Sequence, residues 1–433
     1  MLLKFKVSNF RSISELQEFS MLSGSTRSKQ EHIHEIGDLR ILKNTAMYGA
    51  NAAGKSAFVN AMEISKLFIL HSIDTVTNVK RSYCRAKQEN KKRSSYFEYM
   101  MSIGDRFYSY GFEVVLSEAR LESEWLIELN DSLLEKNVIF QRDCRSENEF
   151  TFGKGFTEDD LSRLNIYASD MKGKNSKMFL TEMSSKNLDD CNNLRVFRSI
   201  FDWFDKKLLV NAVRMPDKKD LAAAGKILKD MDTDISNISY NLISKKELNA
   251  YDQNAINGID QFLRESARNG RNEVFINPRD WVMFELGPNG LKASKIRTLH
   301  GNENPFDVDE ESTGTKEILL MISVLTGEDD DITYVRDEFG NGLHPNLSYR
   351  FMELFQEHNR NRSCQLIVTT HETKLMTLDL YRRDEIWFVE KDGGESVIYS
   401  LEEFRERFDK KLSNAYFDGR YGALPVFGEL DKR

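Results

Sequence analysis

Proline is scarce in this chain, with six residues in 433, and glycine is ordinary at 24. Long Pro- or Gly-rich linkers and other low-complexity segments are therefore excluded. The four cysteines lie far apart, at Cys84, Cys144, Cys191 and Cys364, and none forms a CxxC pair. This spacing argues against a disulfide framework or a zinc site and favours a reducing cytosol.

Long apolar runs are missing as well. No segment of the sequence approaches the ~20 apolar residues that a membrane-spanning helix requires. The first ten residues, MLLKFKVSNF, are interrupted by Lys4 and Lys6, so they lack the apolar core of a signal peptide. We therefore expect a cytoplasmic protein that has no membrane segment.

An excess of basic charge is also absent. Lys and Arg number 61 and Asp and Glu number 69, which gives a formal net charge of −8. This balance argues against an obligate nucleic-acid coat protein but allows a local basic patch. Residues 80–93, KRSYCRAKQENKKR, contain a single acid, Glu89. Two interpretations of this basic stretch stay open: a solvated surface loop, or a contact with phosphate or nucleic acid.

The order of apolar patterns along the chain indicates an α/β fold. Residues 96–130 alternate apolar and polar side chains and are rich in Tyr, Phe and Val, which predicts an antiparallel β-meander. Helical periodicity dominates residues 157–270. Helices and strands alternate from residue 316 to residue 389, as in a parallel sheet. The expected parts are 1–150 and 273–433, which form the head, and 151–272, a mainly helical insert or lid.

The sharpest motif is GANAAGKS at residues 49–56, which fits GxxxxGK[ST] between a short apolar strand and a helix start. Such a loop turns its backbone N–H groups toward phosphate oxygens, and the helix that follows adds its positive N-terminal end. Lys55 is expected to reach the β- and γ-phosphates, and Ser56 to bind Mg²⁺. The alternative is a glycine-rich turn with a buried lysine stem. The expected nucleotide-binding residues are Gly49, Asn51, Ala52, Ala53, Gly54, Lys55, Ser56 and Ala57.

Two adjacent carboxylates follow a second strand, at residues 332–336. Ligands bind at the carboxyl ends of the strands in open parallel sheets. We expect Asp337 to complete the Mg²⁺ shell and Glu338 to act as the base that polarises the attacking water. The alternative is a solvated acidic loop, because residues 328–331 are also acidic.

His371 follows a third strand, at residues 365–370. An imidazole at this edge of the sheet can hydrogen-bond the γ-phosphate and orient water, so His371 is the second expected catalytic residue. A lone histidine is more often structural, which is the alternative.

Residues 311–317, ESTGTKE, open a helix. A Ser or Thr cap with a downstream Glu is an ordinary helix start. A hydroxyl, a glycine and a helix N-terminus also suit the γ-phosphate of a nucleotide bound by a second subunit. The residues concerned are Ser312, Thr313, Gly314 and Thr315.

The order of the P-loop, ESTGT, the Asp-Glu pair, LHP at 343–345 and TTH at 369–371 resembles the ABC-type ATPases of the SMC, RecF and OLD group. The opening KVSNFRSI resembles the N-terminal strand and turn of that group, which implies that Arg11 contributes to nucleotide binding. The resemblance covers roughly residues 1–130 and 275–433.

A closer resemblance is to the stand-alone OLD-like ATPases of bacterial anti-phage defence, which include abortive-infection ATPases and the PARIS-type ATPase. The residues that carry it lie at 382–389 and 419–425.

The group resemblance implies a P-loop NTPase fold of ABC-ATPase type, with ATP and Mg²⁺ as cofactors. Its members form head-to-tail assemblies around ATP, so we expect a homo-oligomer of heads. In such an assembly Ser312 and Gly314 of one head face Lys55 and Ser56 of another. The expected D-loop between the two sites consists of Gly342, Leu343 and His344.

The residues that follow His371 are too few for the Toprim nuclease domain of OLD proteins. The resemblance therefore implies a sensor or regulator of a separate toxic effector, a nuclease, with a phage protein or DNA as the trigger. A second interpretation stays open: a RecF- or SMC-like repair or recombination ATPase that clamps DNA. The basic stretch favours this alternative and the net charge opposes it. A non-hydrolysing scaffold is disfavoured by Lys55, Asp337 and Glu338.

Overall fold

A computed structural model describes residues 1–188, 193–212, 215–216, 220–268, 274–277, 279–301, 304–404 and 412–423. Leu424 and Pro425, which belong to the tail that carries the OLD-like resemblance, lie outside the described residues. The chain divides into two compact units. Unit 1 comprises 1–211, 329–339 and 356–433, and unit 2 comprises 212–328 and 340–355.

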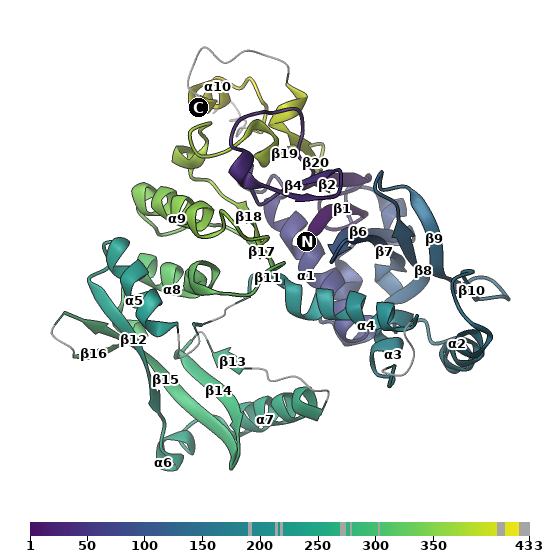
Figure 1. Cartoon of the computed structure of the whole chain (residues 1–433), viewed down its shortest axis with the longest axis horizontal. Helices are drawn as coiled ribbons and strands as arrows, with labels where there is room; N and C mark the ends of the chain where they lie inside the picture. Colours follow the sequence, from purple (N-terminus) through teal and green to yellow (C-terminus); the bar gives the residue numbers. More distant parts are fainter. Residues whose placement is uncertain are drawn as a thin grey trace, which may run out of the picture. The chain divides into compact units, whose positions relative to one another are not determined.

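A six-stranded sheet in unit 1 positions the predicted motifs, in the order β11-β17-β18-β5-β19-β20 (Figure 1). The first five strands pair in parallel, and β20 pairs antiparallel with β19. All residues of β5 and β18 are buried, as expected for strands covered on both faces. The bounds are β5 (Asn44–Tyr48), β11 (Leu208–Val210), β17 (Thr333–Arg336), β18 (Gln365–Thr369), β19 (Ile386–Asp392) and β20 (Glu395–Ser400).

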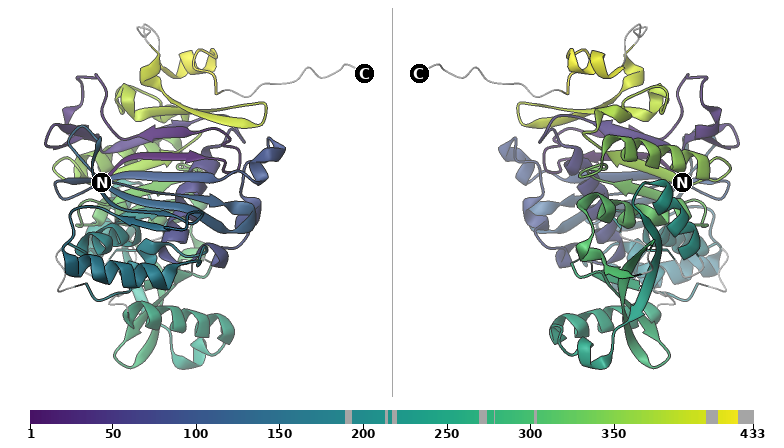
Figure 2. Two further views of the ribbon diagram at one scale, coloured as in Figure 1. Left: turned by 90° about the vertical axis from the view of Figure 1, so that its right-hand side faces the viewer. Right: turned by 90° about the vertical axis from the view of Figure 1, so that its left-hand side faces the viewer.

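A seven-stranded antiparallel sheet forms the other layer of unit 1, in the order β10-β9-β8-β7-β6-β1-β2; its purple and blue strands lie side by side in Figure 2. Strands β6 to β8 confirm the meander predicted for residues 96–130. The bounds are β1 (Leu2–Ser8), β2 (Gln17–Ser20), β6 (Ser95–Ile103), β7 (Arg106–Val115), β8 (Arg120–Leu129), β9 (Glu135–Asp143) and β10 (Phe150–Phe152).

Aromatic side chains of helix α1 (Lys55–Leu70) and of both sheets meet in one core. Phe58 contacts Phe5 and Phe19, with ring centroids 5.6 and 5.1 Å apart, and Phe19 contacts Trp387 of β19 at 4.9 Å. These rings belong to one buried core, which supports α1 close to the P-loop.

Other helices of unit 1 cover the meander. Phe140 of β9 packs against Phe179 and Phe197, with centroids 5.2 and 5.5 Å apart. The remaining elements of unit 1 are α2 (Glu158–Met171), α3 (Phe179–Ser184), α4 (Arg195–Asp202), α10 (Leu412–Phe417) and the hairpin β3 (Ile33–Ile36) to β4 (Leu39–Leu42).

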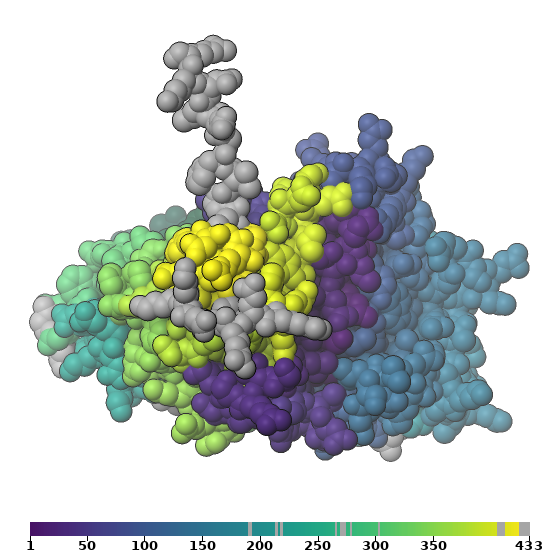
Figure 3. Space-filling model, turned by 90° about the horizontal axis from the view of Figure 1, so that it is seen from above, coloured from purple at the N-terminus to yellow at the C-terminus, as the bar shows by residue number. Residues whose placement is uncertain are grey.

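Segments from the two ends of the sequence close unit 1 together. In Figure 3 the purple N-terminal residues lie beside the yellow-green residues of the C-terminal part. The backbone N–H of Ile398 donates to Gln17 Oε1 at 2.9 Å, and that of Gly24 donates to Asp384 Oδ2 at 2.8 Å. Unit 1 is therefore built from residues that are more than 350 positions apart in sequence.

Unit 2 contains an antiparallel sheet of order β12-β15-β14-β13, with β16 paired to β15. Helix α7 lies along β13 and β14 (Figure 1), over a core that includes Leu263 and Phe284. The bounds are β12 (Ile235–Leu242), β13 (Val274–Asn277), β14 (Val282–Gly287), β15 (Gly290–His300), β16 (Pro305–Asp307), α5 (Leu221–Asp230), α6 (Lys245–Leu248), α7 (Gln253–Arg268) and α8 (Thr313–Thr326); α9 (Pro345–His358) begins here and ends in unit 1.

Strand β12 falls in the stretch with helical periodicity, where few strands were expected. Its sequence ISNISYNL mixes the strand formers Ile and Tyr with Ser and Asn, and it forms a strand paired with β15. Among the described residues, no helix is both long and apolar enough to cross a bilayer.

Candidate active site

The loop 49–56 connects β5 to α1 and is wedged against the last two strands of the sheet. A Cβ on Gly49 would lie 2.4 Å from the Val389 carbonyl oxygen, and one on Gly54 would lie 2.2 Å from Ser396 Oγ. Gly54 has φ of +123° and Ala52 has φ of +62°. Contact with β19 and β20, as well as the turn itself, therefore requires the two glycines.

Lys55 lies inside this loop with 5% of its surface exposed. Its Nζ donates to the Gly49 and Ala50 carbonyl oxygens at 2.8 and 3.1 Å. Burial lowers the pKa of Lys55 to about 8, against the opposing effect of the Asp337 and Glu338 carboxylates. The ammonium is thus held on the concave side of the loop, where backbone N–H groups of a P-loop meet phosphate.

The carboxylate pair is fixed at the carboxyl end of β17 by two neighbouring elements. Thr369 Oγ1 donates to Asp337 Oδ1 and accepts from the Glu338 backbone N–H at 3.0 Å. The Asp337 backbone N–H donates to Asn211 Oδ1 at 2.9 Å. Glu338 has φ of +53°, a left-handed conformation that is costly for a glutamate. Strand β17 is internal, flanked by β11 and β18, so its carboxyl end is well supported.

His371 comes two residues after β18 and lies near the same carboxylates. Burial lowers the pKa of His371, and the Lys55 ammonium lowers it further, while Glu338 and Asp337 oppose the shift. The imidazole is therefore neutral at pH 7 and presents one N–H donor and one acceptor.

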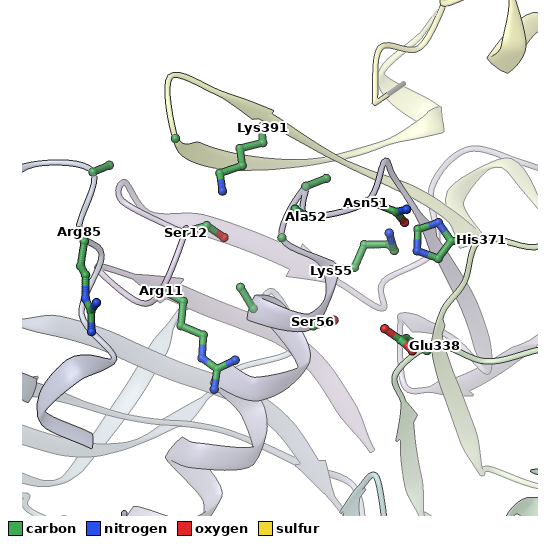
Figure 4. A pocket seen from close by; sticks show the side chains of 15 residues that line it. Arg11, Ser12, Asn51, Ala52, Lys55, Ser56, Arg85, Glu338, His371 and Lys391 are labelled. Carbon is green, nitrogen blue, oxygen red and sulfur yellow. The ribbon is translucent and has the colours of Figure 1, made fainter. Parts of the chain in front are cut away.

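One cavity of about 720 Å³ brings these groups together (Figure 4). Lys55, Glu338 and His371 lie at one end of the view, and Arg11 and Arg85 lie at the other. The lining residues are Arg11, Ser12, Asn51, Ala52, Ala53, Gly54, Lys55, Ser56, Ala57, Arg85, Ala86, Glu338, His371, Lys391 and Gly394.

Most of the residues expected to bind nucleotide or to catalyse therefore share this cavity. Gly49 and Asp337 do not line it; they contact residues that do, or lie next to them in sequence. Sequence reasoning did not name Ser12, which follows Arg11 in the motif KVSNFRSI, and it missed Lys391 and Gly394, for which no motif provides a signal. Arg85 could have been suspected, since it belongs to the basic stretch 80–93.

The basic stretch is fastened beside the cavity by ion pairs. Lys87 pairs with Glu395 at 2.8 Å and with Glu15 at 3.3 Å, and Arg93 pairs with Glu15 at 3.2 Å. Glu395 is next to the cavity residue Gly394 in the β19–β20 hairpin. Part of this stretch thus forms a wall of the cavity.

The residues at the cavity fit a hard divalent cation whose remaining ligands are phosphate oxygens. Ser56 offers a hydroxyl at the cavity, and Asp337 offers a carboxylate of which one oxygen is engaged by Thr369. Mg²⁺ is commonly bound by one or two protein oxygens together with substrate phosphates and water. Within the described part of the chain there is no cluster of three or more His, Cys, Asp or Glu side chains that could hold a metal by itself.

The ESTGT segment belongs to unit 2, where it begins α8. Ser312 caps the helix, since its Oγ accepts from the Thr315 backbone N–H at 3.1 Å, and both Ser312 and Thr313 are exposed. A Cβ on Gly314 would lie 2.9 Å from the Gly342 carbonyl oxygen. Gly314 is therefore required for close packing between this segment and the residues expected to form the D-loop.

The expected D-loop residues follow the same packing. Gly342 has φ of +81°, and Leu343 Cδ2 would be 3.5 Å from a Cβ on Gly314. His344 Nδ1 accepts from the Asn346 backbone N–H at 3.2 Å and so caps the start of α9. The structure brings Gly342 and Leu343 against the signature segment, while His344 has a local role.

Comparison with known proteins gives a family match. A family model described as "AAA domain, putative AbiEii toxin, Type IV TA system" matches residues 45–377, well over half of the chain. No curated protein matches the sequence significantly.

The solved structures that are similar include SMC head domains. An SMC head bound to the C-winged helix domain of ScpA is 13% identical, with a TM-score of 0.42 over 92% of this chain and 97% of that one. An SMC head with extended coiled coil from Pyrococcus furiosus, bound to the C-terminal domain of ScpA, is 15% identical, with a TM-score of 0.39 over 94% and 99%. The SMC head domain from Thermotoga maritima is 14% identical, with a TM-score of 0.34 over 92% and 98%.

The sheet order, the P-loop between β5 and α1, and the carboxylates at the end of β17 agree with the P-loop NTPase fold of ABC-ATPase type expected from the sequence. On the family match, the chain belongs to the AAA-domain family whose description names the AbiEii toxin of type IV toxin–antitoxin systems.

Proposed function

We propose that this protein binds ATP with Mg²⁺, hydrolyses it slowly, and assembles head to tail around the bound nucleotide. The observation that carries the proposal is the single cavity that contains Lys55, Ser56, Glu338 and His371. A P-loop lysine, a hydroxyl for the metal, a carboxylate base and an imidazole are the groups that phosphoryl transfer to water needs.

In this proposal each group has a separate task. Lys55 leaves its carbonyl partners and neutralises charge on the β- and γ-phosphates. Ser56 and Asp337 would hold Mg²⁺, which supplies positive charge to the phosphate oxygens when bound. Glu338 accepts a proton from the water that attacks the γ-phosphorus, and the bond to the β–γ bridging oxygen breaks, which leaves ADP and phosphate. His371 donates a hydrogen bond to a γ-phosphate oxygen.

The signature segment supports the proposal of assembly. Ser312 and Thr313 are exposed, and they belong to a different compact unit from the P-loop. An exposed helix N-terminus that carries Ser312 and Thr313 suits the γ-phosphate of a second copy. Because ATP then becomes part of the interface, association depends on ATP concentration.

We further propose that the assembly regulates a separate toxic effector, a nuclease, in defence against phage, with a phage protein or DNA as its trigger. The family description, which names a toxin of a toxin–antitoxin system, supports a toxic outcome. The OLD-like resemblance of the segment 382–389 supports the defence role.

A DNA-clamping repair ATPase of RecF or SMC type is the second candidate. The observation in its favour is that Lys91 and Lys92 of the basic stretch are exposed. The engagement of Arg85 at the cavity and of Lys87 and Arg93 in ion pairs leaves fewer cations of this stretch for DNA.

The test uses the full-length Glu338→Gln variant with ATP and Mg²⁺. We expect a slowly dissociating dimer or larger oligomer in analytical ultracentrifugation, which ADP does not support. Failure to associate at any ATP concentration would contradict the assembly. A pull-down of the same variant from its host extract then separates the two candidates, since a stoichiometric nuclease supports the first and DNA with recombination proteins supports the second.

A further inference from the structure

Glu311, the residue immediately before the signature serine, is tied to the sheet of unit 2. Its Oε1 accepts a hydrogen bond from His300 Nε2 at 2.8 Å and another from Thr298 Oγ1. The Glu311 side chain is only 9% exposed, and Thr298 is fully buried. A nearly dehydrated carboxylate depends on such donors, so this contact holds the backbone at residue 311 firmly in place.

The two donors, Thr298 and His300, lie on a strand that is paired on both sides. Thr298 and His300 are two residues apart on β15 and therefore point to the same face of the sheet. β15 is paired on both sides here, since Thr298 lies opposite Ile238 of β12 and Phe306 of β16. The His300 ring also packs edge-on against the Phe306 ring, with centroids 4.8 Å apart.

The connection from β16 to α8 is fastened at further points. The Asp307 carboxylate accepts from Lys295 and Arg297 of β15 at 2.5 and 2.7 Å. Lys316 Nζ of α8 donates to the Asp309 carbonyl oxygen at 2.9 Å. Glu311 is the carboxylate within this connection that is withdrawn from water, and it lies closest in sequence to Ser312.

The backbone at this point determines where the signature hydroxyl lies. Glu311 and Ser312 are both extended, with ψ of 157° and 155°, and α8 begins at the next residue. A rotation at residue 311 would therefore swing Ser312 and the first N–H groups of α8 away from their present direction. Ligand groups misplaced by about 1 Å lose much of their effect on the reacting phosphate.

We infer that Glu311 is a positioning residue for the proposed composite ATP site. Held by Thr298 and His300, it sets the direction of Ser312 and the α8 N-terminus, so the inserted sheet of unit 2 controls whether the signature can engage the γ-phosphate of a second copy. This inference rests on the proposed function, because it acts through the signature residue.

The test is a double-mutant cycle in the full-length chain, carried out in the Glu338→Gln background. The variants are Glu311→Gln, Ser312→Ala and their combination, with Thr298→Val as a second way to break the contact. Asp309→Asn is the matched control, since it removes an equal charge at an exposed position two residues away. The readouts are ATP-driven association, affinity for a fluorescent ATP analogue at low protein concentration, and thermal unfolding.

We expect Glu311→Gln and Thr298→Val to weaken ATP-driven association about tenfold, with nucleotide affinity changed less than about twofold. The control should behave as the parent. Adding Glu311→Gln to Ser312→Ala should have almost no further effect on association, because both act through the same contact. If Glu311 had a purely structural role, Glu311→Gln and Thr298→Val would lower the unfolding temperature. The effects of Glu311→Gln and Ser312→Ala on association would then be additive.

Additive effects, or unchanged association in Glu311→Gln, would overturn this inference alone. If Ser312→Ala itself leaves association unchanged, the signature has no role and the inference fails with it. Failure of the proposed function as a whole would give a different result. The parent Glu338→Gln chain would then bind no ATP, or would not form oligomers in the presence of ATP.

Discussion

The cavity proposed to bind nucleotide in unit 1 and the proposed signature segment of unit 2 are built in opposite ways. Lys55 is almost completely buried, and the loop around it is pressed against β19 and β20. Ser312 and Thr313 are exposed, and the Ser312 hydroxyl and carbonyl groups accept bonds from the first turn of α8. The cavity is thus formed within one chain, whereas in the proposed assembly the signature segment would contribute to the site of a second copy. Four variants and one matched control test this contrast, taken from the largest expected effect to the smallest.

Lys55→Ala should have the largest effect. It removes the buried ammonium at the concave side of the loop, so binding of MgATP should weaken by at least about 100-fold, the loss expected for a charge-assisted contact to phosphate worth about 3 kcal/mol. Isothermal titration calorimetry measures the affinity, with thermal unfolding as the control for folding. Affinity equal to that of the unmodified chain would show that this cavity is not the nucleotide site.

Glu338→Gln should come next. The amide keeps the size of the side chain but cannot accept the proton of water, so turnover should fall about 10²- to 10⁴-fold while ATP binding is retained. A phosphate-release assay at saturating ATP measures the rate. Hydrolysis at the unmodified rate would rule out Glu338 as the base and leave His371 as the catalytic candidate.

Gly342→Ala addresses the signature side of the contrast. At φ of +81° an alanine is strained by about 1–2 kcal/mol, and its Cβ would approach the Thr313 side chain to 3.1 Å. We expect weaker ATP-driven association with little change in ATP affinity, measured by ultracentrifugation and calorimetry.

Gly258→Ala in α7 is the matched control for Gly342→Ala, because a Cβ there meets nothing within 4 Å. It should stabilise unit 2 by about 0.5–1 kcal/mol and leave association unchanged. If Gly342→Ala instead abolished ATP binding, the two halves of the proposed site could not be treated as independent.

Lys91→Gln combined with Lys92→Gln should have the smallest effect. Both side chains are exposed, and neither lines the cavity. We expect unchanged ATP affinity and turnover and, under the defence proposal with a phage protein as the trigger, unchanged DNA binding at a stated salt concentration. A clear loss of DNA affinity with a shallower salt dependence would favour the DNA clamp.

Sequence reasoning performed best where the structure is local. The P-loop strand, turn and helix are consecutive, and the meander at 96–130 consists of neighbouring strands, so period and turn chemistry were sufficient. It performed least well for β12, whose strand conformation comes from pairing with β15 more than fifty residues later in the chain. The boundaries 151–272 for the insert stay a prediction.

The sequence by itself determined which candidate functional groups the chain contains: the P-loop lysine and serine, the carboxylate pair, the histidine and the proposed signature. Each proposed role was assigned from one residue or a few neighbouring residues at the end of a predicted strand or the start of a predicted helix. Only the tertiary structure decided which distant groups join them. Arg85 and Lys391 reach the cavity because the basic stretch is clamped to the β19–β20 hairpin and β19 pairs with β5. Glu311 reaches Thr298 and His300 because antiparallel pairing returns the chain to β15. Such contacts depend on strand order and register, which no local pattern of residues specifies.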